Sequence, residues 1–300
     1  MRLDGSLDGI IVPLISPLAE DESLDVRGLQ RLVEHVITGG VSGIFVLGSS
    51  GEGPSLPDET KERLVQVVSE QIGGRVPLLV GAFGVGTRQT IELARRLTRH
   101  GGDAVVVAAP YYFAMTQAEI LAHVTTVALS LDVPTMFYNI PSMVKTVTEP
   151  ETVLEMAATP EVISVKDSMG DMTRFQGLLA IRKSHPDFGV FQGAEGVVAL
   201  SLARGANGGV LGLANVAPSL CVQIYAAARA GDQPHLWALQ EQLMILWKLH
   251  THGQWLPCLK AAVSHLGICG ATASSPFARL GAQARSGVRA DMVAAGVLPK

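Results

Sequence analysis

Lys166 is the residue of this chain best placed for covalent chemistry at a carbonyl carbon. It is the one lysine of seven that directly follows a strand-like apolar run, residues 162–165. We expect an amine there to be partly desolvated, which lowers its pKa and frees the nucleophilic form. Such an amine condenses with a ketone to an iminium, an electron sink for breaking a neighbouring C–C bond. A structural ion pair, for instance with Asp167, is the alternative, and position alone does not separate the two.

Tyr138 ends the preceding apolar run and offers a phenol close to that amine. A phenol has an unperturbed pKa of about 10, so as a base it needs neighbours that pass the proton on. Ser49, Tyr111 and Tyr112 are candidates for such a chain of hydroxyls. Any single tyrosine is more often an amphipathic rim residue. Three of the four tyrosines nevertheless follow apolar runs, which favours a functional role.

The segment 48–53 reads Gly-Ser-Ser-Gly-Glu-Gly and follows another apolar run. It lacks the Gly-Lys-Ser/Thr of a phosphate-binding loop. Two adjacent serines between glycines still offer hydroxyls and backbone N–H groups to a small anion such as a carboxylate. A simple strand-to-helix turn is the alternative. Metal catalysis has weaker support, because His250 and His252 are two apart and no cluster of ligands has metal-binding spacing.

Apolar runs at fairly steady intervals must position these residues. They are rich in Val, Ile, Leu and Ala and do not alternate with polar residues, which is typical of parallel strands covered on both faces. We expect strands at residues 9–15, 43–48, 77–82, 104–109, 134–138, 162–166, 190–193 and 208–213.

Segments with helical spacing lie between the apolar runs. They are residues 24–37, 57–71, 87–100, 116–129, 149–157, 172–183, 195–203 and 218–230. Strands and helices that alternate with a period of about 30 residues predict an α/β fold, a (βα)₈ TIM barrel. A doubly wound sheet is the rival, but residues 81–86 do not fit the G-x-G-x-x-G fingerprint of its dinucleotide-binding forms.

The predicted barrel occupies residues 1–230, and residues 231–300 are expected to form a C-terminal helical region packed on it. Helical spacing there covers residues 234–250, 256–266 and 289–295. In such barrels the reactive groups stand at the C-terminal ends of the strands. The predicted strands end at Tyr138 and Lys166, which places both side chains at that rim.

The composition excludes several classes of protein. The chain has 300 residues, of which 48% are hydrophobic and 17% charged, and its formal net charge is −4. These values exclude wholesale disorder, and a weakly acidic chain has no bulk affinity for nucleic acid. The longest uncharged stretch, residues 205–228, contains four glycines and several polar residues, so we expect no membrane span. Without a signal-peptide pattern or a framework of cysteines, we expect a cytoplasmic protein.

Five motifs in order resemble those of a known superfamily. They are Gly-Ser-Ser-Gly-Glu at 48–52, Pro-Tyr-Tyr at 110–112, Tyr-Asn-Ile-Pro at 138–141, Val-Lys-Asp-Ser at 165–168 and Gly-Val-Leu-Gly-Leu-Ala-Asn at 209–215. Together they resemble the dihydrodipicolinate synthase / N-acetylneuraminate lyase superfamily, and the resemblance covers nearly the whole chain. Members are Schiff-base (βα)₈ enzymes, most of which handle pyruvate.

The resemblance implies roles for individual residues. Lys166 matches the Schiff-base lysine, and Tyr138 matches the tyrosine that moves the proton. Ser49 links this tyrosine to a second one, matched by Tyr112, which in the family reaches across a subunit interface. Further substrate-binding candidates are Ser49, Ser50, Gly51, Ser168, Gly193, Glu195 and Leu211. The resemblance also implies a pyruvate or 2-oxo acid substrate, no cofactor beyond the covalent Schiff base, and a homotetramer built as a dimer of dimers.

Two of these candidates have equally plausible structural roles. Glu195 falls about where neuraminate lyases place an acidic residue that binds sugar hydroxyls, but it is also a first-turn carboxylate of a predicted helix. Ser168 is positioned to contact the same substrate chain, yet serine is also a frequent helix cap.

The sequence departs from dihydrodipicolinate synthases at Met143, where they typically have an arginine that holds the substrate carboxylate. A thioether cannot replace that bidentate clamp. The run from Lys166 to Asp171 looks more like those of 4-hydroxy-2-oxoglutarate and 2-keto-3-deoxy sugar-acid aldolases. We therefore expect a class I pyruvate aldolase acting on a 4-hydroxy-2-oxo acid or a 2-keto-3-deoxy sugar acid. The alternatives are 4-hydroxy-tetrahydrodipicolinate synthase, a sugar-acid dehydratase and, more remotely, a non-catalytic binding protein.

Overall fold

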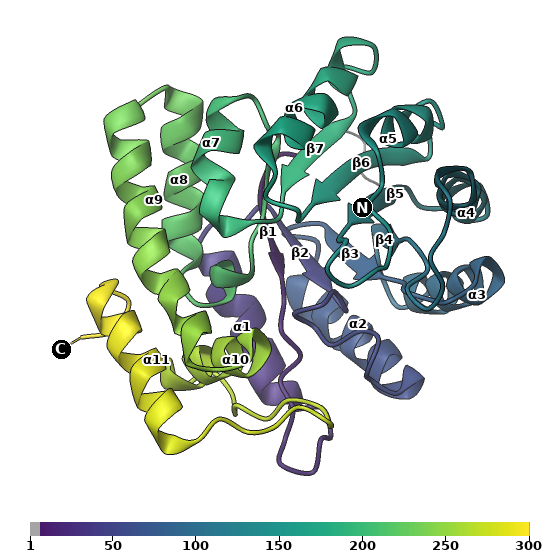
Figure 1. Ribbon diagram of the computed structural model, residues 1–300. Helices are drawn as coiled ribbons and strands as arrows, with labels where there is room; N and C mark the ends of the chain where they lie inside the picture. Colours follow the sequence, from purple (N-terminus) through teal and green to yellow (C-terminus); the bar gives the residue numbers. More distant parts are fainter. Residues whose placement is uncertain (1–6, 300) are drawn as a thin grey trace.

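Eight parallel strands close into a barrel in the computed structural model, which describes residues 7–299 (Figure 1). Each strand pairs with its neighbours in chain order, and β1 pairs with β8 to complete the ring. The predicted (βα)₈ barrel is thereby confirmed. The strands are β1 (Gly9–Pro13), β2 (Gly43–Val46), β3 (Leu78–Gly81), β4 (Ala104–Ala108), β5 (Thr135–Asn139), β6 (Val162–Asp167), β7 (Gly189–Gln192) and β8 (Gly208–Val210).

Burial on both faces explains the composition of the strands. All their residues are buried except Ile163, which is partly exposed. Side chains of one face fill the barrel interior, and those of the other face pack under the helices. Continuous runs of Val, Ile, Leu and Ala satisfy both faces, whereas an alternating pattern would place polar groups in one of the two cores.

Helices follow the strands around the outside of the barrel (Figure 1). Short polar caps begin several of them: the Asp25 carboxylate accepts from the Gly28 N–H, and Thr116 and Glu119 form a reciprocal capping box. The helices are α1 (Val26–Thr38), α2 (Asp58–Ile72), α3 (Thr87–Thr98), α4 (Gln117–Leu129), α5 (Pro150–Ala157), α6 (Met172–Ala180), α7 (Val198–Ala203) and α8 (Pro218–Ala230).

Four further helical segments follow the barrel. They are α9 (Gln233–Trp247), the 3₁₀ turn η4 (Lys248–His252), α10 (Trp255–His265) and α11 (Ala282–Ala294). Figure 1 shows α9 running alongside α8, with α10 and α11 at the lower left. The last helix begins at Ala282 rather than at residue 289, because its first turns are too polar for helical spacing to reveal them. A boundary between two domains at residue 230 stays a prediction.

No helix among residues 7–299 is long and apolar enough to cross a membrane.

One predicted helix begins differently from the expectation. Its first residues form the 3₁₀ turn η2 (Glu195–Val197), and the α-helix α7 starts only at Val198. This irregular turn matters for the site, because it aims the Glu195 side chain at a neighbouring loop.

Candidate active site

The C-terminal ends of β5 and β6 bring Tyr138 and Lys166 side by side. The two residues are direct partners in the parallel ladder, and each is only 4% exposed. The Lys166 Nζ lies 3.8 Å from the centre of the Tyr138 ring and 5.3 Å from that of Phe45. Ladder register therefore holds a buried amine against a phenol, which is the pair that the sequence predicted to share the rim.

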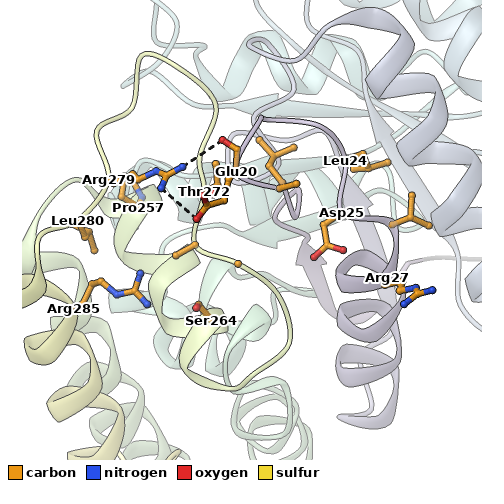
Figure 2. Close-up of a pocket in the computed structure, with 15 residues that line it drawn as sticks. Glu20, Leu24, Asp25, Arg27, Pro257, Ser264, Thr272, Arg279, Leu280 and Arg285 are labelled. Carbon is orange, nitrogen blue, oxygen red and sulfur yellow. Dashed lines mark hydrogen bonds and ion pairs between the residues drawn. The ribbon is translucent and has the colours of Figure 1, made fainter.

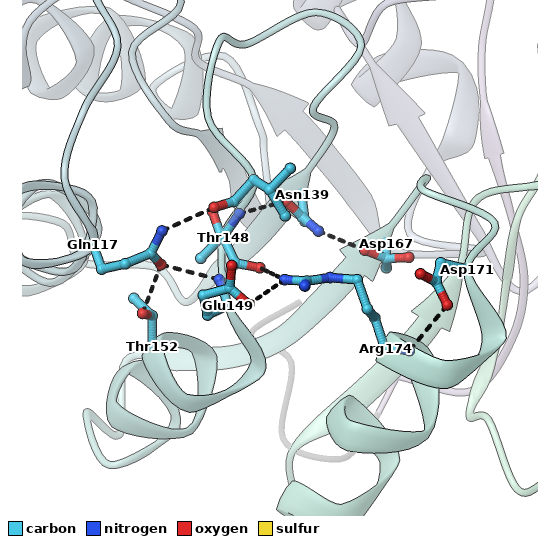
Figure 3. Close-up of polar contacts among 9 residues, drawn as sticks. Gln117, Asn139, Thr148, Glu149, Thr152, Asp167, Asp171 and Arg174 are labelled. Carbon is cyan, nitrogen blue, oxygen red and sulfur yellow. Dashed lines mark hydrogen bonds and ion pairs between the residues drawn. The ribbon is translucent and has the colours of Figure 1, made fainter.

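The Asp167 carboxylate lies on the opposite face of β6 from Lys166, because successive side chains of a strand alternate. Its Oδ1 accepts a hydrogen bond of 2.6 Å from the Asn139 Nδ2 (Figure 3). Its Oδ2 accepts one from the Met169 N–H at 3.2 Å. Asn139 and Asp167 are partners in the ladder as well. Burial raises the pKa of Asp167, while the bond from Asn139 opposes this shift. The carboxylate thus joins the two strand ends behind Tyr138 and Lys166.

Ser168 and Gly193 complete the surroundings of the amine. The Ser168 Oγ lies 3.5 Å from the Tyr138 hydroxyl, a long hydrogen-bond contact. A Cβ on Gly193 would lie 2.2 Å from the Ser168 Oγ and 3.0 Å from the Lys166 Cε. A side chain at Gly193, directly after β7, would therefore collide with the Ser168 hydroxyl and crowd the lysine.

The loop after β2 is tightly folded and carries Ser49. Leu47 and Glu52 adopt left-handed φ angles of 59° and 56°, a conformation that costs non-glycine residues on the order of 1–3 kcal/mol each. A Cβ on Gly53 would lie 1.9 Å from the Leu47 carbonyl oxygen, so the loop requires glycine there. The surrounding structure must hold this backbone in place, and the Glu52 side chain has partners outside the loop.

Glu52 is held by the C-terminal region. Its carboxylate forms an ion pair with Lys260 of α10, and both side chains have no exposed surface. The other carboxylate oxygen accepts a hydrogen bond of 2.6 Å from the Ser274 N–H. Lys260 also donates to the Thr272 carbonyl oxygen at 2.6 Å. A buried ion pair that is satisfied in this way anchors the loop to a part of the chain outside the barrel strands.

A cavity of about 270 Å³ opens above Tyr138, between this loop and the C-terminal region. Its lining includes four residues that carry hydroxyl groups, Ser49, Ser55, Tyr111 and Tyr138, and Glu52 also borders it. The remaining lining residues are apolar or aromatic: Pro54, Phe83, Ala108, Ile140, Met143, Val144, Trp255 and Phe277. Small-molecule sites commonly combine such an apolar wall with a few placed polar groups.

A larger cavity of about 690 Å³ lies elsewhere, between residues 18–27 and the C-terminal region (Figure 2). It shares no lining residue with the cavity above Tyr138. Figure 2 shows Arg279 directed toward Glu20, whose carboxylate lies 3.6 Å away. None of the site residues predicted from the sequence borders it, so the smaller cavity is the candidate active site.

The structure separates the two adjacent tyrosines of the loop after β4. Tyr111 lines the cavity, whereas Tyr112 is 63% exposed and packs edge-on against Phe113. Lys145 donates to the Tyr112 carbonyl oxygen at 2.7 Å. Within a single chain, Tyr112 therefore stands outside the cavity.

The remaining predicted residues lie around the rim. Glu195 accepts hydrogen bonds from the N–H groups of Gly212 and Leu213 at 2.8 and 3.3 Å, and so holds the 3₁₀ turn η3 (Gly212–Asn215). Leu211 is fully buried. Ser50 and Gly51 are buried as well and do not border the cavity.

Sequence reasoning missed the aromatic walls and the partner of Glu52. Phe45 lies in a predicted strand and was interpreted only as core, and Phe83 follows the predicted strand at 77–82 and was given no role. Trp255 and Phe277 belong to the C-terminal region that was expected to pack on the barrel. The signal for Glu52 was its place in the 48–52 motif. Within residues 7–299, no group of three or more His, Cys, Asp or Glu side chains is arranged to hold a metal ion.

Comparison with known proteins identifies the family. The model of the dihydrodipicolinate synthetase family matches residues 6–295. Proteins named 4-hydroxy-tetrahydrodipicolinate synthase are similar over nearly the whole chain. The one from Leptothrix cholodnii is 34% identical over 290 residues, covering 97% of this chain and 98% of its own. The one from Gluconacetobacter diazotrophicus is 35% identical over 292 residues, covering 97% of each chain.

Solved structures agree with this assignment. Dihydrodipicolinate synthase from Bacteroides thetaiotaomicron superposes with a TM-score of 0.91 at 38% identity, over 96% of this chain and 98% of its own. A prophage protein of the same family from E. coli K12, solved in complex with pyruvate, gives a TM-score of 0.93 at 26% identity, over 97% and 99% of the two chains. The chain therefore belongs to the dihydrodipicolinate synthetase family, whose members are pyruvate-dependent class I lyases that form a Schiff base with a lysine.

Proposed function

We propose that Lys166 forms a Schiff base with pyruvate and that the chain makes or breaks a C–C bond between pyruvate and an aldehyde. The observation that carries this proposal is the ladder pairing of Lys166 with Tyr138, which sets a buried amine against a phenol that lines the cavity; Lys166 itself is not among the lining residues. Membership of a family of pyruvate-dependent lyases supports it.

In the cleavage direction, the Lys166 amine attacks the C2 ketone of a 4-hydroxy-2-oxo acid and water leaves, giving an iminium. Tyr138 takes the proton of the C4 hydroxyl and passes its own phenol proton to a neighbouring hydroxyl such as that of Ser49. The C3–C4 bond breaks in the same step, and the bonding electron pair moves into an enamine. The aldehyde departs, C3 is protonated, and hydrolysis of the iminium releases pyruvate and the free amine. Synthesis is the same sequence reversed.

The other site residues take supporting roles in this proposal. Ser49, which lines the cavity, offers its hydroxyl to the pyruvyl carboxylate. The family resemblance assigns the same carboxylate to Ser50 and Gly51, which follow Ser49 in the loop and are buried. The missing side chain of Gly193 leaves room beside the lysine, and the Ser168 hydroxyl lies 3.5 Å from that of Tyr138. The exposed Tyr112 remains available to a neighbouring subunit of a homotetramer.

The names of the relatives support one aldehyde, aspartate semialdehyde, since 4-hydroxy-tetrahydrodipicolinate synthase condenses it with pyruvate. Met143 favours a second candidate, aldol cleavage of a 4-hydroxy-2-oxo acid. Its thioether borders the cavity at a position where a carboxylate-binding arginine would be required. Both candidates use the same Lys166 adduct and differ only in the electrophile.

Borohydride reduction in the presence of pyruvate, followed by intact-mass measurement, tests the shared step. We expect the wild type to gain one reduced pyruvyl group and Lys166→Ala to gain none. Lys145→Ala is the matched control, because this nearby lysine is exposed, and it should trap like the wild type. An adduct on Lys166→Ala would overturn the mechanism. A wild type that traps no 2-oxo acid would favour a non-catalytic binding protein instead.

A further inference from the structure

The cavity above Tyr138 contains little charge. No Arg, Lys or His side chain is among its lining residues in the described part of the chain. Its one acidic residue, Glu52, is already engaged by Lys260 and by the Ser274 N–H. Because the side chains of this ion pair have no exposed surface, a ligand in this space meets hydroxyl-bearing and apolar residues and no free charge among the lining residues.

Most of the residues that line the cavity are apolar or aromatic. Phe83 packs tilted against the Tyr138 ring, with ring centres 6.3 Å apart. Ile140 and Met143 border the cavity from the loop after β5, and Trp255 and Phe277 border it from the C-terminal region. Met143 is 50% exposed, so it lies where the cavity meets solvent.

An apolar wall of this kind favours uncharged ligand groups over charged ones. A carboxylate or ammonium group that enters it gives up water and finds no opposite charge, which is strongly unfavourable. An apolar group that enters it gains from leaving water. The volume of about 270 Å³ lies just below the range of roughly 300–1,000 Å³ usual for small-molecule sites, so the group must be small.

Several arginines border other cavities of this chain, among them Arg31. Arg27, Arg279 and Arg285 line the larger cavity of Figure 2, which shares no lining residue with the cavity above Tyr138. They therefore add no cation to the walls of the candidate active site.

We propose that the electrophile of the Lys166 reaction is an aldehyde with a small, uncharged, apolar substituent, held by Met143, Trp255 and Phe277. This inference rests on the proposed function, since it presumes the pyruvate adduct. In the bond-forming direction, the enamine C3 adds to the aldehyde carbon, Tyr138 supplies the proton to the new hydroxyl, and hydrolysis frees the 4-hydroxy-2-oxo acid.

A matched pair of aldehydes tests it. 4-Methylpentanal and succinic semialdehyde differ in that an isopropyl group replaces a carboxylate of similar shape. With pyruvate in excess, we expect the wild-type kcat/KM to be about tenfold or more higher for 4-methylpentanal, because the carboxylate stays unpaired. Aspartate semialdehyde should be as poor as succinic semialdehyde. A higher kcat/KM for either charged aldehyde overturns the inference, as does an enzyme that traps pyruvate but does not turn over 4-methylpentanal.

A new cation at the mouth of the cavity should reverse the preference. Met143→Arg is expected to raise kcat/KM for succinic semialdehyde and to lower it for 4-methylpentanal. Leu129→Arg, on an exposed position of α4, adds the same charge away from the cavity and should leave the ratio unchanged. An unaltered ratio of the two kcat/KM values in Met143→Arg would overturn the assignment of Met143 to the residues that hold the aldehyde substituent. Borohydride trapping runs in parallel: trapping with the wrong preference overturns only this inference, whereas absent trapping overturns the proposed function and this inference with it.

Discussion

The two sides of the candidate active site are held in different ways. On the β5–β6 side, Tyr138 and Lys166 are ladder partners, and the hydrogen bond between Asn139 and Asp167 joins the same two strands behind them. On the opposite side, Ser49 stands on a loop whose anchor is Glu52. The partners of Glu52 come from the C-terminal region, and the bond from Ser274 spans 222 residues of sequence.

The difference shows that the two buried carboxylates of this rim, Asp167 and Glu52, are stabilised by different kinds of neighbour. On the strand side, Asp167 lies beside the Asn139 amide and a backbone N–H, and the charge of Arg174 acts on it only at longer range. These neighbours lower the pKa of Asp167 less than burial raises it. The loop residue Glu52 has no ladder to position it, and a distant lysine neutralises it instead. One side depends on backbone register, whereas the other depends on a buried ion pair.

The largest expected effect is on the ion-pair side. Lys260→Met leaves Glu52 buried without its cation, so we expect a loss of about 3–5 kcal/mol in the free energy of unfolding. Urea unfolding followed by circular dichroism measures it. The double variant Glu52→Gln/Lys260→Met removes both charges and should recover much of the loss. Equal losses in the single and double variants would show that the two charges are not coupled.

A smaller effect is expected on the ladder side. Asn139→Ala removes a hydrogen bond from the buried Asp167 carboxylate, at a cost of about 1–3 kcal/mol. Because Asn139 sits directly behind Tyr138, we also expect slower formation of the pyruvate adduct. Lys260→Met should instead mainly raise the KM for pyruvate, since it loosens the Ser49 loop. The comparison of the two sides breaks down if both variants change the same kinetic parameter.

The smallest effect concerns pH. The pKa of Asp167 is raised in the folded protein above its ordinary value of 3.8, chiefly by burial. The protonated form of Asp167 stabilises the folded protein. This contribution to the free energy of unfolding is fully present below the ordinary pKa and is lost as the pH rises through the folded pKa. Asp167→Asn cannot ionise, so its stability should improve relative to the wild type as the pH increases. Urea unfolding between about pH 3.5 and 7 measures the difference in the free energy of unfolding between Asp167→Asn and the wild type. A difference that shifts in favour of the wild type as the pH rises would contradict a raised pKa.

Much of the fold could be predicted from local patterns. Strands buried on both faces must be apolar throughout, so all eight were visible as runs of Val, Ile, Leu and Ala. The placement of Lys166 and Tyr138 at one rim followed, because parallel strands all end at the same side of a barrel. The start of α11 was predicted too late, since polar first turns carry no periodic signal.

Other parts of the site were hidden because their partners lie far away in the chain. Nothing in the local sequence of Lys260 distinguishes a buried ion pair from a surface lysine on an amphipathic helix. The contribution of Trp255 and Phe277 to the cavity depends on where the C-terminal helices dock. Similarly, Tyr111 and Tyr112 follow β4 in irregular backbone, where no period tells which of the two faces the cavity.

The sequence by itself determined the barrel, the amine and the phenol at its rim, and the family motifs, because each of these depends on residue type and local order. Only the tertiary structure decided that the C-terminal region supplies both a wall of the cavity and the countercharge of Glu52. The physical reason is that hydrophobic periodicity reports burial of a residue's own element. The identity of the group that meets a buried charge is set by packing between elements.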